Sequence, residues 1–230
     1  MPGRVCVTIP VRDEEANKLR WAKIVPPYAG KKWGMYFIPE KDDQVLLAFE
    51  NGNIEKPFII GSVHRDKDNI LSASTDKNNQ TKTIKTRNGS HVTFFDSKED
   101  ESGEKDKISV ITANDAHTFR LDNENKKMEL FDKAKNCHVE MKTENGEISI
   151  KAAKKLTITV GDSITVTMNG DSGSVTVKAK KYALKTEGNI ALNADGNVKV
   201  SGQQITQDAS AAAKIKGDLV QVSGSMVKMG

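Results

Sequence analysis

The chain has few aromatic residues, few cysteines and no long apolar run, and each shortage excludes a class of protein. Aromatics make up 5% of the 230 residues, and most of them, including both tryptophans, lie before Phe95. A conventional globular core along the whole chain is therefore not expected. Cys6 and Cys137 stand in unrelated contexts, which is more typical of buried, reduced thiols than of a disulfide. No apolar stretch reaches the roughly 18 residues of a transmembrane helix.

An excess of one charge is also missing. The formal net charge is +4, from 35 Lys and Arg against 31 Asp and Glu. Residues 1–65 hold ten basic and eight acidic side chains, so no domain is strongly basic. Without such a basic surface, nucleic acid is not an expected partner. The start, MPGRVCVTIP, also lacks the apolar run of a secretory signal.

What the chain does have is a short repeat of alternating apolar and polar residues from about Gly146 to Val222. The units are ISIKA from Ile148, LTITV from Leu156, ITVTM from Ile164, VTVKA from Val175, YALKT from Tyr182, IALNA from Ile190 and VKVSG from Val198. Each unit is predicted to be a strand with one apolar face. Two or three apolar side chains per strand cannot close a core in one copy, so the pattern favours several chains wrapping together in a β-helix.

The alternation also assigns each side chain to a face. Thr165 and Asn193 are predicted to point outward. The residues predicted to form a trimer core are Ile148, Ile150, Leu156, Ile158, Ile164, Val166, Val175, Val177, Ile190, Leu192, Val198 and Val200.

Three segments make up the chain. Residues 1–65 contain five strand-like runs, which indicate a five-stranded barrel of the OB type: RVCVTIPV, RWAKIVPP, GMYFIP, DQVLLAFE and FIIGSVH. Residues 66–86 are polar and predicted to be an extended linker. Residues 87–230 are predicted to form a β-helical needle, whose repeat tightens toward the C-terminus.

Two groups of residues allow a functional and a structural interpretation. His91, His117 and His138 recur at one place in a coarse repeat, so a trimer could hold metal ions between tripled imidazoles. The alternative is histidines near turns that bond to backbone or solvent, and this alternative is favoured because the chain has no His-x-His or Cys-x-x-Cys pair. No metal or other cofactor is therefore expected.

The aromatic residues of the barrel are the second group. Trp21, Trp33, Tyr36 and Phe37 could stack on single-stranded nucleic acid, as aromatics of OB barrels often do. Their alternative role is packing in the barrel core and between barrels, which the balanced charge favours. No enzyme is expected either, because the linker is too short to hold a catalytic domain and the needle offers no nucleophile with a base partner.

The barrel segment resembles a known family. From Trp21 to His64 it reads WAKIVPPYAGKKWGMYFIPEKDDQVLLAFENGNIEKPFIIGSVH, which is similar to the barrel of contractile-injection spikes: the VgrG proteins of type VI secretion and the baseplate spikes of contractile phage tails. The matching residues are Trp21, Ala22, Lys23, Ile24, Pro27, Tyr28, Ala29, Gly30, Trp33, Gly34, Phe37, Pro39, Val45, Phe49, Gly52, Asn53, Pro57 and Gly61. The resemblance covers roughly Gly3 to Arg65. It departs at Asp42 to Gln44, where relatives have Gly-Gln-Glu.

The resemblance implies an all-β homotrimeric spike, with an OB barrel followed by an intertwined triangular β-helix. Such a spike punctures a target envelope at the tip of a contractile apparatus. It implies a PAAR-type tip protein or an effector at the C-terminal end, on Met226, Val227, Lys228, Met229 and Gly230. It also implies a tail-tube or baseplate hub at the N-terminal side and transient contact with a target membrane. The protein is then assembled in the bacterial cytoplasm without a signal peptide and delivered outward.

Other interpretations stay open. A trimeric adhesin or tail-fibre shaft would use the same strands, although it would need a receptor-binding head, and none is recognised after Val222. An OB nucleic-acid binder with a β-solenoid tail is disfavoured by the charge. Type VI members carry a large N-terminal docking region, so we expect either a fragment or a system where that region is a separate protein. The sequence leaves a phage tail, a type VI apparatus and an extracellular injection particle equally open.

The repeat predicts the length of the needle. Roughly 16 to 18 strands from Arg87 to Gly230, each advancing the chain by about 4.8 Å, give a shaft of ~75–90 Å. A single chain coiling alone would be about a third as long, because three of its strands would share each layer. Electron microscopy of the purified protein measures this length, and a stubby body of roughly 30 Å beyond the barrel would contradict the intertwined needle.

Overall fold

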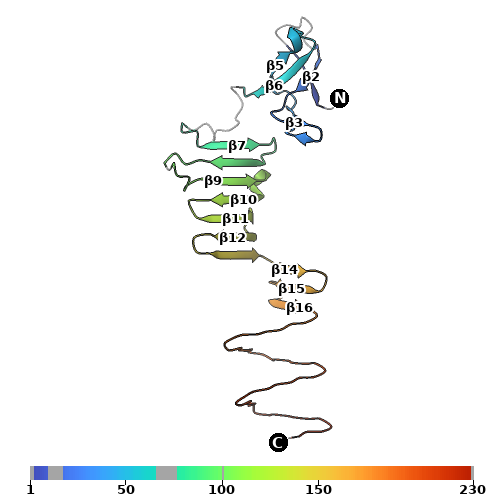
Figure 1. The fold of residues 1–230 in the computed structure, drawn as a ribbon, viewed down its shortest axis with the longest axis vertical. Helices are drawn as coiled ribbons and strands as arrows, with labels where there is room; N and C mark the ends of the chain where they lie inside the picture. Colours follow the sequence, from blue (N-terminus) through green and yellow to red (C-terminus); the bar gives the residue numbers. More distant parts are fainter. Residues whose placement is uncertain (1–2, 10–17, 66–76, 100, 229–230) are drawn as a thin grey trace. The chain divides into compact units, whose positions relative to one another are not determined.

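The computed structural model describes residues 3–9, 18–65, 77–99 and 101–228, and these residues form strands, turns and short 3-10 segments (Figure 1). The expected all-β class is confirmed. The chain divides into two units, residues 1–177 and residues 178–230. Among the described residues, no helix has the length and apolar character needed to cross a membrane.

The N-terminal region is built on a four-stranded sheet with the order β1-β2-β6-β5. Its strands are β1 (Arg4–Val7), β2 (Arg20–Ile24), β5 (Gln44–Phe49) and β6 (Pro57–Val63). The β2–β6 pair is parallel, and the other two pairs are antiparallel. A separate two-residue ladder joins β3 (Ala29–Gly30) to β4 (Trp33–Gly34).

One of the five strands expected in the barrel does not form. In the run GMYFIP only Gly34 pairs, and residues 35–39 are not in a strand. Gly34 has φ +139°, and a Cβ there would lie 2.7 Å from the carbonyl oxygen of Tyr28, so the backbone turns sharply at a residue that must be glycine. The apolar side chains that follow, Met35 to Ile38, are all exposed, so no buried face forms.

The core of this region is small. Val7, Ala22 and Ile59 are buried, and the partly buried residues packed against them are Val5, Ile24, Val45 and Leu47. Beside this core the buried Arg20 guanidinium lies 3.3 Å from Oε1 of Glu55, which also lies 3.0 Å from Lys18 Nζ. Hydrogen bonding from Lys18 lowers the pKa of Glu55.

Residues 81–152 form a seven-stranded antiparallel sheet in which every strand pairs with its neighbours in sequence (Figure 1). Its strands are β7 (Thr81–Lys85), β8 (His91–Phe95), β9 (Lys107–Ile111), β10 (His117–Asp122), β11 (Lys127–Asp132), β12 (Cys137–Lys142) and β13 (Glu147–Ala152). Of the linker expected over residues 66–86, residues 66–76 lie outside the described residues, and Thr81–Lys85 form a strand.

A smaller antiparallel sheet follows, in the order β14-β15-β16. Its strands are β14 (Lys155–Val160), β15 (Ile164–Asn169) and β16 (Ser174–Lys178). The intertwined β-helix expected from residue 87 onward is not shown for residues 87–178, which form open sheets that are hydrogen-bonded within one chain. The three-chain needle stays a prediction.

Local turn chemistry explains why these strands pair within the chain. In the β11–β12 turn, the Asp132 carboxylate accepts hydrogen bonds from the backbone N–H of Cys137 (2.6 Å) and Ala134 (3.1 Å), which lower the pKa of Asp132. In the β10–β11 turn, Asp122 accepts from the N–H of Asn125 at 3.0 Å. Such Asp-centred turns reverse the chain within a few residues, so the next strand returns beside the previous one.

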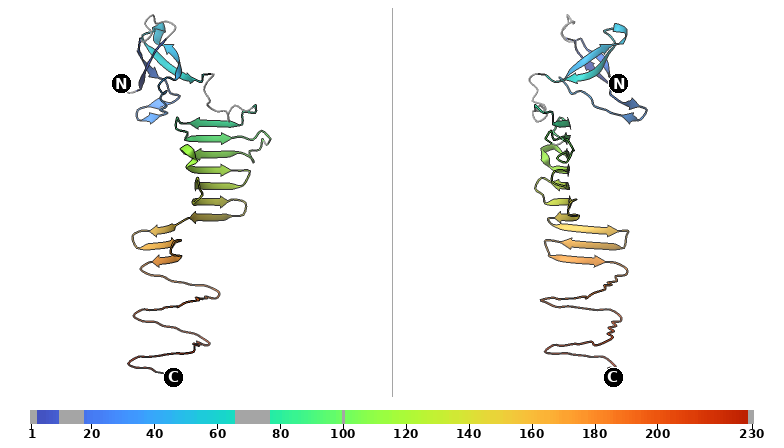
Figure 2. Two further views of the ribbon diagram at one scale, coloured as in Figure 1. Left: turned by 180° about the vertical axis from the view of Figure 1, so that it is seen from behind. Right: turned by 60° about the vertical axis from the view of Figure 1, so that its left-hand side comes forward.

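Residues 178–228 have a different organisation. Bends recur every seven or eight residues, at Lys180, Glu187–Gly188, Asp195–Gly196, Gln203, Ser210–Ala211, Asp218 and Ser225. Between the bends the chain sweeps from side to side in views 60° apart (Figures 1 and 2). No strand and no backbone–backbone hydrogen bond joins one run to another within residues 180–228. The eight-residue spacing is present, but among the described residues no backbone–backbone hydrogen bond involves residues 180–228.

The small N-terminal core predicts a graded response to truncation of Ile59. Because this side chain is 3% exposed, Ile59→Ala should lower the free energy of unfolding by about 2–5 kcal/mol and Ile59→Val by about 0.5–1.5 kcal/mol. Thermal or denaturant unfolding of the full chain measures both. Lys56→Ala, at an exposed position before the same strand, is the control and should change stability by less than ~0.5 kcal/mol. Equal effects of all three would contradict the core assignment.

Candidate functional site

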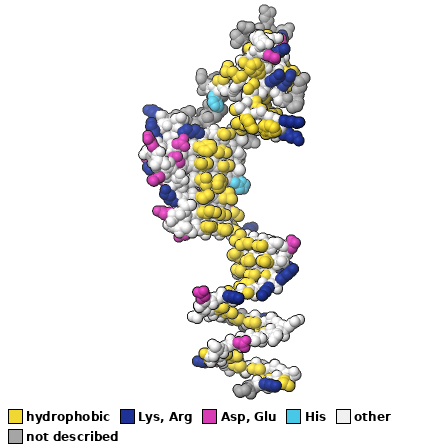
Figure 3. Space-filling model, in the orientation of Figure 1, with side chains coloured by type: hydrophobic (Ala, Val, Ile, Leu, Met, Phe, Trp, Pro, Cys, Tyr) yellow, Lys and Arg dark blue, Asp and Glu magenta, His cyan; other side chains and the backbone are white. Residues whose placement is uncertain are grey.

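The most prominent surface of the chain is one side of the seven-stranded sheet, here called the apolar face. The strand register aligns its side chains in two rows that cross the sheet. One row is Ile84, Val92, Val110, Phe119, Leu130, Val139 and Ile150, and the other is Phe94, Ile108, Leu121, Met128, Met141 and Ile148. Figure 3 shows these apolar side chains gathered in a continuous band over β7–β13.

The apolar face is not covered by the described residues of the chain. Ten of its thirteen side chains are exposed, from 38% at Ile108 to 67% at Ile148. A contiguous apolar surface of this extent is rare on a stable monomer and marks an interaction site. The face is therefore a candidate assembly interface.

The smaller sheet repeats this arrangement. Its register places apolar pairs on one side, Leu156–Met168, Ile158–Val166 and Val160–Ile164, and threonine pairs on the other, Thr157–Thr167 and Thr159–Thr165. Val175 and Val177 of β16 are also exposed. Each sheet thus has one side suited to water and one side that lacks a partner.

Six of the twelve residues predicted to form the trimer core are placed on these sides by the strand register. Ile148 and Ile150 are on the apolar face, and the four residues of β14 and β15 lie together on one side of the smaller sheet: Leu156, Ile158, Ile164 and Val166. The members beyond residue 178 are exposed and belong to no strand: Ile190, Leu192, Val198 and Val200. Their burial in an assembly stays a prediction.

The predicted tip-binding residues lie at the end of the second unit. Met226 and Val227 are exposed, as is Lys228, whereas Met229 and Gly230 lie outside the described residues. Their role in binding a tip protein stays a prediction.

The side of the seven-stranded sheet opposite the apolar face, here called the polar face, carries paired charges. Lys127 lies 3.0 Å from Glu140, and Lys142 lies 3.0 Å from Glu147. Hydrogen bonding from Lys127 lowers the pKa of Glu140, and hydrogen bonding to Glu147 raises the pKa of Lys142. Opposite charges on adjacent strands stabilise this side of the sheet.

The three histidines do not share one face. By strand alternation His91 and His138 lie on the polar face, whereas His117 lies on the side of the apolar face, at the end of β10. His91 Nδ1 is 2.8 Å from the carbonyl oxygen of Gly89, and His117 Nδ1 is 3.4 Å from Thr112 Oγ1. The prediction that they occupy equivalent positions is therefore wrong. The turns between strands differ in length, so the three histidines do not lie on the same side of the sheet.

The barrel aromatics are exposed and do not form its core. Trp21, Trp33, Tyr36 and Phe37 are between 51% and 69% exposed, so the core-packing interpretation is wrong for them. The last three line a cavity of about 440 Å³, in which Lys32 is the one charged lining residue. A nucleic-acid groove needs more positive charge than this. Packing between barrels stays a prediction.

Cys6 and Cys137 are also exposed, which contradicts the expected burial of the thiols.

Comparison with known families identifies the N-terminal region. A family described as "Type VI secretion system/phage-baseplate injector OB domain" matches residues 1–64. Residues 1–64 thus match the OB domain of this injector family, consistent with VgrG and baseplate spikes. No curated protein matches the chain. The resemblance seen in the sequence is thus confirmed for residues 1–64.

The two sides of the smaller sheet predict opposite outcomes for neighbouring substitutions. Ile164→Asp should abolish association of the chains, because every copy would bring an unpaired charge into an apolar interface, at a cost of several kcal/mol. Thr165→Asp, one residue along β15 on the threonine side, should leave association unchanged. Size-exclusion chromatography with light scattering measures both variants. Equal effects would show that the faces are assigned wrongly.

Proposed function

We propose that the protein is the trimeric spike of a contractile injection apparatus. In this proposal three OB domains form a collar. Three copies of residues 81–178 pack their apolar sides against one another, and three copies of residues 178–228 wind together into a needle. The needle is driven into a target envelope and acts mechanically, without catalysis.

The observation that carries the proposal is the backbone of residues 180–228. A chain that coiled alone would hydrogen-bond each turn to the next, at about 4.8 Å. This segment makes no such bond, although its bends recur with the regularity of a β-helix. Backbone N–H and C=O groups in strand-like segments need partners. In the proposed trimer, runs of the two neighbouring copies would lie between successive runs of this segment and would supply these hydrogen-bond partners.

The apolar faces support the same assembly. Each copy leaves one apolar side uncovered in both sheets. Sheets that meet through these sides would bury them in a dry interior, with the charged pairs of the polar face outside. Three copies is the number that the resemblance to contractile-injection spikes implies. The path of residues 178–228 sweeps from side to side both in Figure 1 and in the view turned by 60° in Figure 2, as a chain that winds around an axis would.

Such a shaft suits compressive load. Strands would lie across the axis and be hydrogen-bonded above and below, so force along the axis passes through a continuous ladder with a packed apolar interior. A tail-fibre shaft would use similar strands, but the injector OB domain favours the spike. The remaining partners belong to this proposal: a baseplate hub beside the OB domain, a PAAR-type tip protein or effector at residues 226–230, and transiently the target membrane.

Light scattering and hydrogen exchange test the proposal together. The full chain should have a mass of about three times 25.2 kDa in dilute solution. In the same sample, backbone amides of residues 180–228 should exchange slowly, because neighbouring chains would accept their hydrogen bonds. The β7–β13 amides, bonded within the chain, provide the protected reference. A folded monomer, or a trimer whose 180–228 amides exchange at unfolded rates, would overturn the intertwined needle.

A further inference from the structure

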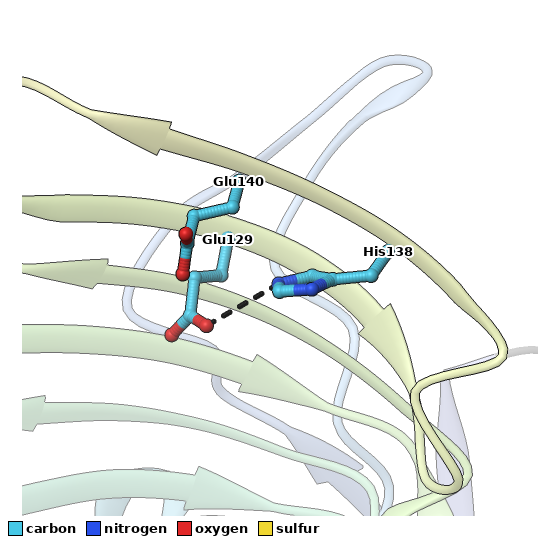
Figure 4. A group of neighbouring side chains, drawn as sticks. All are labelled: Glu129, His138 and Glu140. Carbon is cyan, nitrogen blue, oxygen red and sulfur yellow. Dashed lines mark ion pairs between the residues drawn. The ribbon is translucent and has the colours of Figure 1, made fainter. Parts of the chain in front are cut away.

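A cluster on the polar face has the composition of a metal site. Glu129 of β11 stands directly opposite Glu140 of β12 in the strand register, and His138 lies two residues before Glu140 on the same side. One ligand atom from each of these residues lies within 4.8 Å of the others. Figure 4 shows the three side chains close together, with a dashed line from the Glu129 carboxylate to the imidazole ring. All three side chains belong to one chain, so no assembly is needed to form the cluster.

The Glu129 carboxylate lacks the partners that a buried charge requires. Its side chain is 8% exposed, and like charges directly opposite each other on adjacent strands are destabilising. Among the described residues it accepts no hydrogen bond, and its ammonium partner, Lys135, is 3.9 Å away. Glu140 is better compensated, because Lys127 lies 3.0 Å from its Oε2 and leaves Oε1 for another ligand.

His138 directs a buried and unpaired nitrogen at this carboxylate. Its Nε2 lies 3.3 Å from Glu129 Oε1, marked by the dashed line in Figure 4, yet the atom has no hydrogen-bond partner among the described residues. The ring is held edge-on by Phe131, at 5.6 Å between centroids and 84° between planes. Ligands bonded at 2.0–2.1 Å to a tetrahedral ion are about 3.3 Å apart. The separation observed is therefore the one that two ligands of a common ion would have.

We propose that Glu129, His138 and Glu140 bind one divalent transition-metal ion per chain, with zinc the best match to one imidazole and two carboxylates. The ion would neutralise the facing carboxylates, occupy the unpaired Nε2 and link β11 to β12 across the polar face. A fourth position would be left to water. This site is separate from the apolar face and does not depend on the proposed function.

Calorimetric titration of the full-length, untagged protein with ZnCl₂ tests the site, after removal of bound metal by a chelator. The wild type should bind one zinc ion per chain, and zinc should raise its melting temperature. His138→Gln and Glu129→Gln should each weaken binding by at least about tenfold and abolish the shift in melting temperature. Both variants keep a polar side chain of similar size, and circular dichroism verifies that they fold.

His91→Gln is the matched control, since His91 lies on the same polar face of β8, four strands from β12. It should bind zinc as the wild type does. Absence of saturable binding by the wild type would overturn the proposal, as would unchanged affinity in both cluster variants or an equal loss in His91→Gln. Zinc binding by a monomeric chain would support this site while contradicting the trimeric spike.

Discussion

Strict alternation of apolar and polar side chains is the constraint on which the rest of this structure depends. It places thirteen apolar side chains on one side of the seven-stranded sheet and repeats the arrangement in the smaller one. A sheet with one such side must cover it, and the described part of the chain does not. Burying each side chain is worth roughly 1.5–3 kcal/mol. Association is therefore the main source of stability available to this half of the protein, whereas the OB domain has a small core of its own.

The two parts of the chain differ in the backbone hydrogen bonds that they make. Up to residue 178, tight turns stabilised by residues such as Asp122 and Asp132 return each strand to its neighbour, so the ladder is complete within one copy. Beyond that point the bends at Asp195–Gly196 and Asp218 redirect the chain without bringing it back onto itself. Across this boundary the chain passes from strands that pair within one copy to runs that make no backbone–backbone hydrogen bond among the described residues.

The sequence predicted the features that depend on local pattern and failed on those that depend on register. The all-β class and the opposite sides of Ile164 and Thr165 follow from alternation alone, and the OB domain from its ordered motif. Alternation does not indicate whether a strand pairs within its own chain or with another chain, so the open sheets were not predicted. The apolar residues after Gly34 suggested a strand, but the backbone turns sharply at Gly34 and the strand ends there. The cluster of Glu129 and Glu140 gave no signal, because the two residues are eleven apart and only the β11–β12 register makes them face each other.

The boundary at residue 178 also determines how three copies could come together. Each sheet up to that point is complete in one chain, so it can form early and meet its counterparts side by side. In the proposed trimer, the following segment could pair only after the copies are aligned, and each copy would then wind around the other two. Chains wound in this way are linked by topology as well as by contacts, so sideways pulling alone would not separate them.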